Sequence, residues 1–156
     1  MYASGFRPGN AWFDFQIMSN HLVTPRVLVC PADSEAKVAR AFTGTTEGFY
    51  VASGFRGLST SYTVNLHSGS EFSQGLLSSD MNLALENPQQ CGLAMVNSTL
   101  ALMPGEGWTN AIHGLTGNIV AMDGSASPTT TAELRAAATI TQPGVLSNGP
   151  HILKAR

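Results

Sequence analysis

Apolar residues near the start of the chain recur at helical spacing and predict one short amphipathic helix. Within residues 11–23 the apolar positions on one face are Trp12, Phe15, Met18 and Leu22. Pro25 ends this helix, because the residue before a proline is pushed out of the helical region. The run that follows, RVLVC at 26–30, is apolar and β-branched, so it predicts a buried strand.

A second helix is predicted at 34–42, where SEAKVARAF follows the break at Pro31. Asp33 or Ser34 is in position to cap it, since short polar side chains satisfy the first N–H groups of a helix. The apolar face of this helix comprises Ala36, Val38, Ala39 and Phe42.

Three later segments arrange their apolar residues in the way that predicts short strands. SYTVNL at 61–66 alternates apolar and polar side chains and predicts a half-buried strand. GLLSSDMNLAL at 75–85 predicts two short strands around Ser79-Asp80. GNIVAMDG at 117–124 predicts a strand with tight turns on both sides.

The last part of the chain predicts a helix and a final strand. Thr131 is in position to cap AELRAAAT at 132–139, a run of strong helix formers, and GPHILKAR at 149–156 predicts an edge strand. Short strands dominate and no β-α-β alternation occurs. The sequence therefore predicts the α+β class, an antiparallel sheet with a short N-terminal helix and a helix after the last core strand. No internal boundary is evident, so residues 1–156 are expected to form a single domain.

The composition adds one unusual feature, a shortage of charge. Only 12% of residues are Asp, Glu, Lys or Arg, about half the usual share in globular proteins, and the net charge is −2. We therefore expect a polar but nearly uncharged surface. No cluster of basic residues is available to neutralise a phosphate backbone, which argues against nucleic-acid binding. No apolar run reaches the roughly 18 residues that a membrane-spanning helix needs.

The sequence lacks the short motifs of the common catalytic and cofactor sites. It contains no Gly-x-Ser-x-Gly, no phosphate-binding Gly-rich loop and no His-Glu-x-x-His. Its four histidines have no partner at the spacing of a metal site on a helix or strand. We therefore expect no enzymatic activity and no resident cofactor. Calcium is the one open alternative, for which Asp80 and Asp123 are the candidate ligands.

The segment IHGLTGNIVAMDGS at 112–125 contains the most distinctive pair of polar residues. His113 is followed by nine residues and then by Asp123-Gly124, a strong turn dipeptide. We expect the turn at 114–117 to fold His113 back, so that its side chain meets Asp123 at a corner of the sheet. The pair lacks a nucleophile. We therefore interpret it as structural, with the imidazole satisfying backbone groups that a loop leaves unpaired.

The two cysteines, Cys30 and Cys91, are far apart in the sequence, and neither belongs to a Cys-x-x-Cys pair. They cannot supply a four-ligand zinc site by themselves. Judged from composition, two buried free thiols and one disulfide are equally consistent with the chain.

Three short elements occur in one order: C-P-x-D after the apolar run at 26–30, a Ser-Tyr strand that ends in Asn, and His, nine residues, Asp-Gly. Their residues are Cys30, Pro31 and Asp33, then Ser61, Tyr62 and Asn65, and finally His113, Asp123 and Gly124. Together they resemble the globular part of bacterial prepilin-type proteins, the type II secretion pseudopilins and type IV pilins. The resemblance is greatest to the large sets found in Planctomycetes and Verrucomicrobia, and the combined set is specific although each element alone is weak.

The resemblance covers residues 11–138 and departs from the family pattern in two places. Family members usually begin with a short leader and a long apolar helix. Neither is present in this sequence, which therefore resembles a head domain without the N-terminal helix. The turn before Met81 would read Gly-Asp-Arg-Asn in the family and reads Ser79-Asp80-Met81-Asn82 here, a change that would alter an ion site at Asp80.

The resemblance implies a non-enzymatic structural role. In such proteins the upstream helix packs into a filament and the head covers the outside, so the partners are identical or related subunits. The membrane would be reached only through the missing helix. A periplasmic, extracellular or cell-surface location is implied, after initial anchoring in the inner membrane. Such an oxidising location favours a Cys30–Cys91 disulfide.

The main alternative is a secreted module that binds surface polysaccharide. Exposed aromatic rings stack on sugars, and the candidates are Trp12, Phe49, Tyr50, Phe55 and Trp108. A small hydrolase that uses His113 with a carboxylate is a third hypothesis, for which the sequence offers neither a nucleophile nor a metal constellation.

Overall fold

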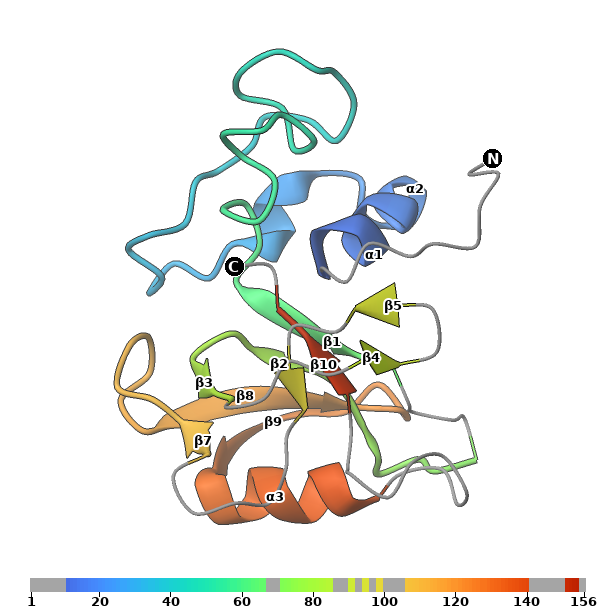
Figure 1. Ribbon diagram of the computed structural model, residues 1–156, viewed down its shortest axis with the longest axis vertical. Coiled ribbons are helices and arrows are strands. Elements are labelled where there is room, and N and C mark those ends of the chain that lie inside the picture. Colours follow the sequence, from blue (N-terminus) through green and yellow to red (C-terminus); the bar gives the residue numbers. More distant parts are fainter. Residues whose placement is uncertain are drawn as a thin grey trace.

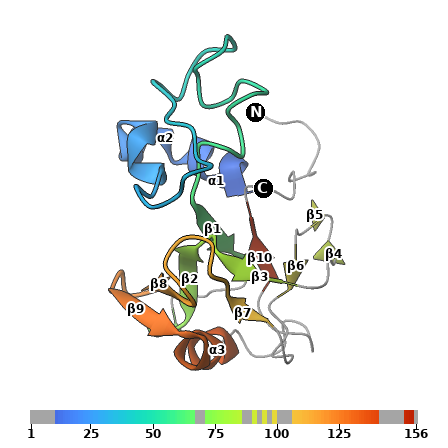
Figure 2. The same cartoon turned by 90° about the vertical axis from the view of Figure 1, so that its left-hand side faces the viewer.

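The computed structural model describes residues 11–66, 71–85, 90–91, 94–95, 98–99, 106–140 and 151–154. An N-terminal segment of short helices and loops lies at one end of the molecule, an antiparallel sheet lies in the middle, and a longer helix covers the opposite end (Figure 1). Figure 2 shows the same order after a quarter turn. No helix among these residues is long and apolar enough to cross a membrane.

The main sheet has six strands in the order β6-β10-β1-β2-β8-β9, and every neighbouring pair is antiparallel. Its strands are β1 (Tyr62–Asn65), β2 (Leu76–Asp80), β6 (Ser98–Thr99), β8 (Thr116–Ala121), β9 (Ala126–Thr130) and β10 (His151–Leu153). Two small ribbons complete the strands: β3 (Leu83–Ala84) pairs with β7 (Gly107–Trp108), and β4 (Gln90–Cys91) pairs with β5 (Ala94–Met95). The α+β class is therefore confirmed, as are the strands predicted at 61–66, 75–85 and 117–124.

The predicted N-terminal helix is present, but it is split at Met18 into α1 (Ala11–Ile17) and α2 (Ser19–Leu22). The buried strand predicted at 26–30 is wrong, because a short 3₁₀ helix, η1 (Pro25–Leu28), occupies most of that run. The residues at the start of η1 explain why a 3₁₀ helix forms here instead of a strand. Pro25 takes the first helical position, and the Thr24 hydroxyl accepts a hydrogen bond from the Arg26 N–H at 3.4 Å, which is an N-cap.

The helix predicted at 34–42 is also wrong. This segment forms no helix, and two of its backbone N–H groups donate to a neighbouring loop, from Lys37 to the Leu58 carbonyl at 2.8 Å and from Arg40 to the Gly48 carbonyl at 3.0 Å. Ala39 and Phe42 are nevertheless buried. Long-range pairing has replaced local helix formation here, since tertiary contacts outweigh modest helix propensity.

Two smaller corrections concern the C-terminal part. The helix α3 (Thr131–Thr139) begins one residue earlier than predicted: its N-cap is Thr130, which forms a capping box with Glu133. The final strand, β10, lies between β6 and β1 rather than at an edge of the sheet.

Two clusters of buried side chains form the core. The first joins the N-terminal segment to the sheet and comprises Ala11, Phe15, Leu28, Ala39, Phe42, Tyr50, Met81 and Leu153. The second lies between the sheet and α3 and comprises Leu76, Leu83, Trp108, Ile119, Leu134, Ala138 and Ile152. The N-terminal segment is thus held to the sheet by packed apolar side chains, and the polar contacts between these two parts form the candidate site.

Candidate functional site

His113 and Asp123 do not meet, so the predicted corner between them is wrong. Strand β8 separates them: His113 precedes its first residue and Asp123 follows its last. The Asp123 carboxylate accepts hydrogen bonds from Gln74 Nε2 at 2.9 Å and from the Ser125 N–H at 2.8 Å. Gly124 has φ +84°, in the left-handed region that favours glycine. The Asp-Gly element therefore forms a turn between β8 and β9, as its residues predict, but it forms that turn without the histidine.

The partners of His113 are Cys30 and Asp80. Its Nε2 atom lies 3.4 Å from Cys30 Sγ and 3.4 Å from Asp80 Oδ2. Asp80 ends β2 and is buried, and the same Oδ2 accepts hydrogen bonds from the Asn118 backbone N–H at 2.6 Å and from Asn118 Nδ2 at 2.9 Å. The carboxylate is thus fixed from the β8 side, and the imidazole connects it to the segment that follows η1.

Both neighbours of His113 contact the same ring nitrogen, and this limits what the site can do. An ionised carboxylate has no proton to donate, so a proton between Asp80 and His113 is carried by Nε2 of the imidazole. With Nε2 protonated, the imidazole cannot also take a proton from the Cys30 thiol through that atom. A cysteine–histidine–aspartate relay uses the two different ring nitrogens for its two contacts. The arrangement therefore fits a structural tie better than a nucleophile with a general base.

Tyr62 lies beside this group at the start of β1. Burial raises the pKa of the Tyr62 phenol above its ordinary value, and the nearby charges of Cys30 and Asp80 raise it further. Residues of all three sequence elements thus gather at the junction between the N-terminal segment and the sheet.

A second polar contact crosses the same junction. The buried Asp33 carboxylate accepts hydrogen bonds from Ser61 Oγ at 2.7 Å and from the Glu35 N–H at 3.2 Å. Asp33 therefore caps a turn rather than the helix predicted for it. Pro31 lies in the exposed turn between Cys30 and Asp33, whose ends are joined by the Asp33 N–H donating to the Cys30 carbonyl at 3.0 Å.

Asn65, the last residue of the Ser-Tyr element, is also structural. Its side chain is buried and donates from Nδ2 to the Leu76 carbonyl at 2.8 Å, which ties the end of β1 to the start of β2. The motif that contains His113 does not reveal Asp80 as its partner. The available signal was strand order, because antiparallel pairing of 76–80 with 116–121 brings the end of the first strand next to the start of the second.

Cys30 is a free cysteine in the structure, and its sulfur contacts His113 rather than another cysteine. Cys30 therefore does not take part in the expected Cys30–Cys91 disulfide. The side chain of Cys91 lies outside the described residues, and only its backbone in β4 is placed.

The candidate calcium ligands, Asp80 and Asp123, lie near opposite ends of β8 and do not share one site. Within the described part of the chain, no group of three or more His, Cys, Asp or Glu side chains is placed to hold a metal ion.

The aromatic residues proposed to stack on sugars are either buried or in contact with a cationic side chain. Tyr50 and Trp108 are buried, at 0% and 5% exposure. The other three rings each lie near a cation: Arg56 near Trp12, Arg40 near Phe49 and Lys37 near Phe55. These contacts give no support to a carbohydrate-binding platform at these five residues.

Comparison with known proteins finds no matching family model, no matching curated protein and no matching solved structure.

Proposed function

We propose that this chain is the globular head of a non-enzymatic, pilin-like structural subunit. The observation that supports this most is the position of the three sequence elements. Cys30 contacts His113, and Asp33 contacts Ser61, so residues of these elements tie the N-terminal segment to the sheet. A head domain on a filament has to keep the segment nearest the filament axis fixed to its sheet, and contacts of this kind do so.

The geometry at His113 favours this role over catalysis. The imidazole joins a carboxylate and a thiol through one nitrogen, and the carboxylate is itself held by Asn118. Each of these groups is used to connect chain segments. With only 12% charged residues, the surface also offers little repulsion between identical subunits packed side by side.

The N-terminal segment presents apolar side chains to solvent, which suits packing between subunits. Ile17, Val23 and Val27 are 63%, 87% and 51% exposed. Val23 also has φ +62°, a strained conformation for a β-branched residue. Scattered exposed apolar residues are ordinary on a protein surface, but several on one short segment are typical of a contact surface. Identical or related subunits are the partners we propose for it, outside the inner membrane.

Immunogold electron microscopy of the organism that encodes the protein tests this role, together with immunoblotting of material sheared from its surface. The wild-type protein should label filaments and occur in the sheared fraction. Val23→Asp should reduce both signals, because a carboxylate opposes apolar packing. It should not impair folding, since Asp tolerates a positive φ better than Val. Val38→Asp, at an exposed valine outside the α1–η1 segment, is the matched control. Absence of the wild-type protein from surface filaments would overturn the proposal.

A further inference from the structure

The six-stranded sheet ends at β9, whose outer edge carries no neighbouring strand among the described residues. Four of its five residues are exposed, and only Thr129 is buried. The unpaired N–H and C=O groups of such an edge are a template on which a strand of another chain can pair. The backbone chemistry of this edge therefore decides whether a second copy of the chain can extend the sheet.

The backbone groups that point out from this edge belong to Ala126, Pro128 and Thr130. Asn118 is opposite Pro128 and donates its N–H to the Asp80 carboxylate at the end of β2, so its backbone faces away from β9. Asn118 and Pro128 are therefore a pair without backbone hydrogen bonds between β8 and β9, and Pro128 directs its own backbone outward. Because successive residues of a strand alternate in this direction, Ala126 and Thr130 also direct their backbone outward.

Two of these three outward positions offer no N–H to a partner strand. Pro128 has no backbone N–H. The Thr130 N–H donates to the Glu133 carboxylate at 2.7 Å, within the capping box that begins α3. This bond also agrees with the outward direction derived from Asn118. Ala126 alone retains a donor, so an incoming strand would leave two of its carbonyls without hydrogen bonds, and such unmet acceptors oppose pairing.

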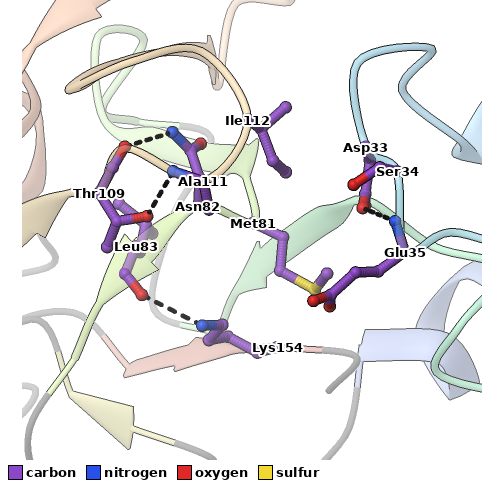
Figure 3. A pocket seen from close by; sticks show the side chains of 10 residues that line it. All are labelled: Asp33, Ser34, Glu35, Met81, Asn82, Leu83, Thr109, Ala111, Ile112 and Lys154. Atoms are coloured by element: carbon purple, nitrogen blue, oxygen red, sulfur yellow. Dashed lines mark hydrogen bonds between the residues drawn. The ribbon is translucent and has the colours of Figure 1, made fainter.

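The small β3–β7 ribbon follows the same pattern. The Asn82 carbonyl accepts from the Thr109 N–H at 2.7 Å, so the backbone of Leu83, the next residue, faces away from β7. The Leu83 N–H donates to the Met81 carbonyl at 2.8 Å. Its carbonyl accepts from Lys154 Nζ at 3.1 Å, a contact in the lining of the pocket that Figure 3 shows. Both outward backbone groups of Leu83 are therefore bonded within the chain.

The opposite edge of the ribbon is protected in the same way, because the Trp108 N–H donates to the Thr131 hydroxyl at 3.2 Å. We propose that Pro128 and the Thr130–Glu133 capping box close the β9 edge, so that a second copy of this chain cannot extend the main sheet. The capping box then has two roles, since the carboxylate that begins α3 also removes a donor from the edge. This inference is independent of the filament proposal, because it holds for a chain that assembles through another surface and for one that does not assemble.

Opening the edge tests the inference. In the double variant Pro128→Thr/Glu133→Ala, position 128 gains an N–H and the Thr130 N–H loses its carboxylate. We expect this variant to self-associate at least about tenfold more tightly than the wild type, the scale of one added backbone hydrogen bond. Light scattering over a concentration series measures the association. Backbone amide hydrogen exchange locates it, since the amides at 126, 128 and 130 should exchange more slowly as the concentration of this variant rises.

Ser127→Thr and Thr130→Ala are the matched controls, and neither should change the association. Ser127 directs its backbone toward β8, so the first control adds a β-branched side chain to the strand without adding an outward donor. The second weakens the start of α3 but leaves the N–H of residue 130 bonded to Glu133.

If the double variant does not fold, Pro128→Thr keeps the capping box, opens one position and should still associate more tightly than Ser127→Thr. Three results would overturn the inference. The first is no gain in association over Ser127→Thr. The second is a gain without slower exchange at 126–130, and the third is slower exchange at these amides in the concentrated wild type.

Discussion

Cys30 Sγ and His113 Nε2 lie 3.4 Å apart, although 83 positions separate the two residues in the sequence. The contact joins the turn that follows η1 to the loop that precedes β8. Through Asp80, it continues to the end of β2. A single imidazole therefore connects three segments that are distant along the chain. Its removal should lower the stability of the fold.

His113→Ala should lower the free energy of unfolding by about 1–3 kcal/mol, because the buried Asp80 carboxylate loses the imidazole that lies 3.4 Å from it and Cys30 loses its hydrogen-bond partner. Urea unfolding followed by circular dichroism measures this. His21→Ala, at an exposed histidine, is the control and should change stability by no more than about 0.5 kcal/mol. Equal stability of the two variants would contradict the structural role of His113.

Ser61→Ala should destabilise the protein by about 1.5–3 kcal/mol, the range for a hydrogen bond to a charged group. The reason is that the buried Asp33 carboxylate loses a hydroxyl donor 2.7 Å away. Thermal and urea unfolding provide the measurement. Ser34→Ala removes an exposed hydroxyl from the residue that follows Asp33 and should be nearly neutral. If both serine variants were neutral, Asp33 would not depend on Ser61.

Stability should depend on pH through Asp123. Hydrogen bonds from Ser125 lower the pKa of the Asp123 carboxyl below its ordinary value, and Gln74 contributes in the same direction. A folded pKa below the unfolded one stabilises the fold above the ordinary value of 3.8, and this contribution is lost as the pH falls through the folded pKa. Asp123→Asn should therefore show a smaller loss of Tm in acid than the wild type. An NMR titration that gives Asp123 a pKa at or above 3.8 would contradict this assignment.

Thr130→Ala should cost about 1 kcal/mol, because it removes the N-cap of α3. The same change should raise the pKa of Glu133 part of the way to its ordinary value. The backbone N–H of Thr130 remains a donor, whereas the hydroxyl donor is lost. Carboxyl NMR titration and thermal unfolding measure the two effects. Thr46→Ala, in an exposed loop, should change neither quantity.

Cys30 should carry a free thiol in the purified protein, since its sulfur faces His113. Iodoacetamide added to denatured, unreduced protein should therefore modify Cys30, which peptide mass spectrometry detects. Recovery of the Cys30 peptide linked to the Cys91 peptide would show instead that the disulfide implied by the pilin resemblance forms.

Periodicity and local turn or helix chemistry predict the elements whose structure follows from their own residues. Strand β8 and its Asp123-Gly124 turn follow from alternation and turn chemistry, and α3 follows from a run of strong helix formers. The helix predicted at 34–42 does not form, because its helix propensity is outweighed by hydrogen bonds to the loop at 48–58. The run at 26–30 failed for a local reason, since Thr24 and Pro25 begin a 3₁₀ helix that the apolar pattern does not reveal.

The sequence predicts which residues belong to the candidate site, but it does not predict which of them contact one another. Cys30, Asp33, Ser61 and His113 were all identified, yet His113 was paired with Asp123, its neighbour in the motif. A strand places its two ends far apart, at about 3.3 Å for each residue, so the residues that flank β8 cannot meet. The true partner, Asp80, comes from the adjacent antiparallel strand, and only the order of strands in the sheet reveals it.

The place of β10 has a consequence for how the chain is made. It is the last described strand in sequence order, yet it fills the gap between β6 and β1, where Leu153 pairs with Val64 and Ile152 with Asn65. A ribosome delivers the chain from its N-terminus at about 5–20 residues per second, so β1 waits for this neighbour until residues 151–153 have emerged. During that interval one edge of β1 lacks its partner, and unpaired strand edges are the kind of surface through which incomplete chains associate.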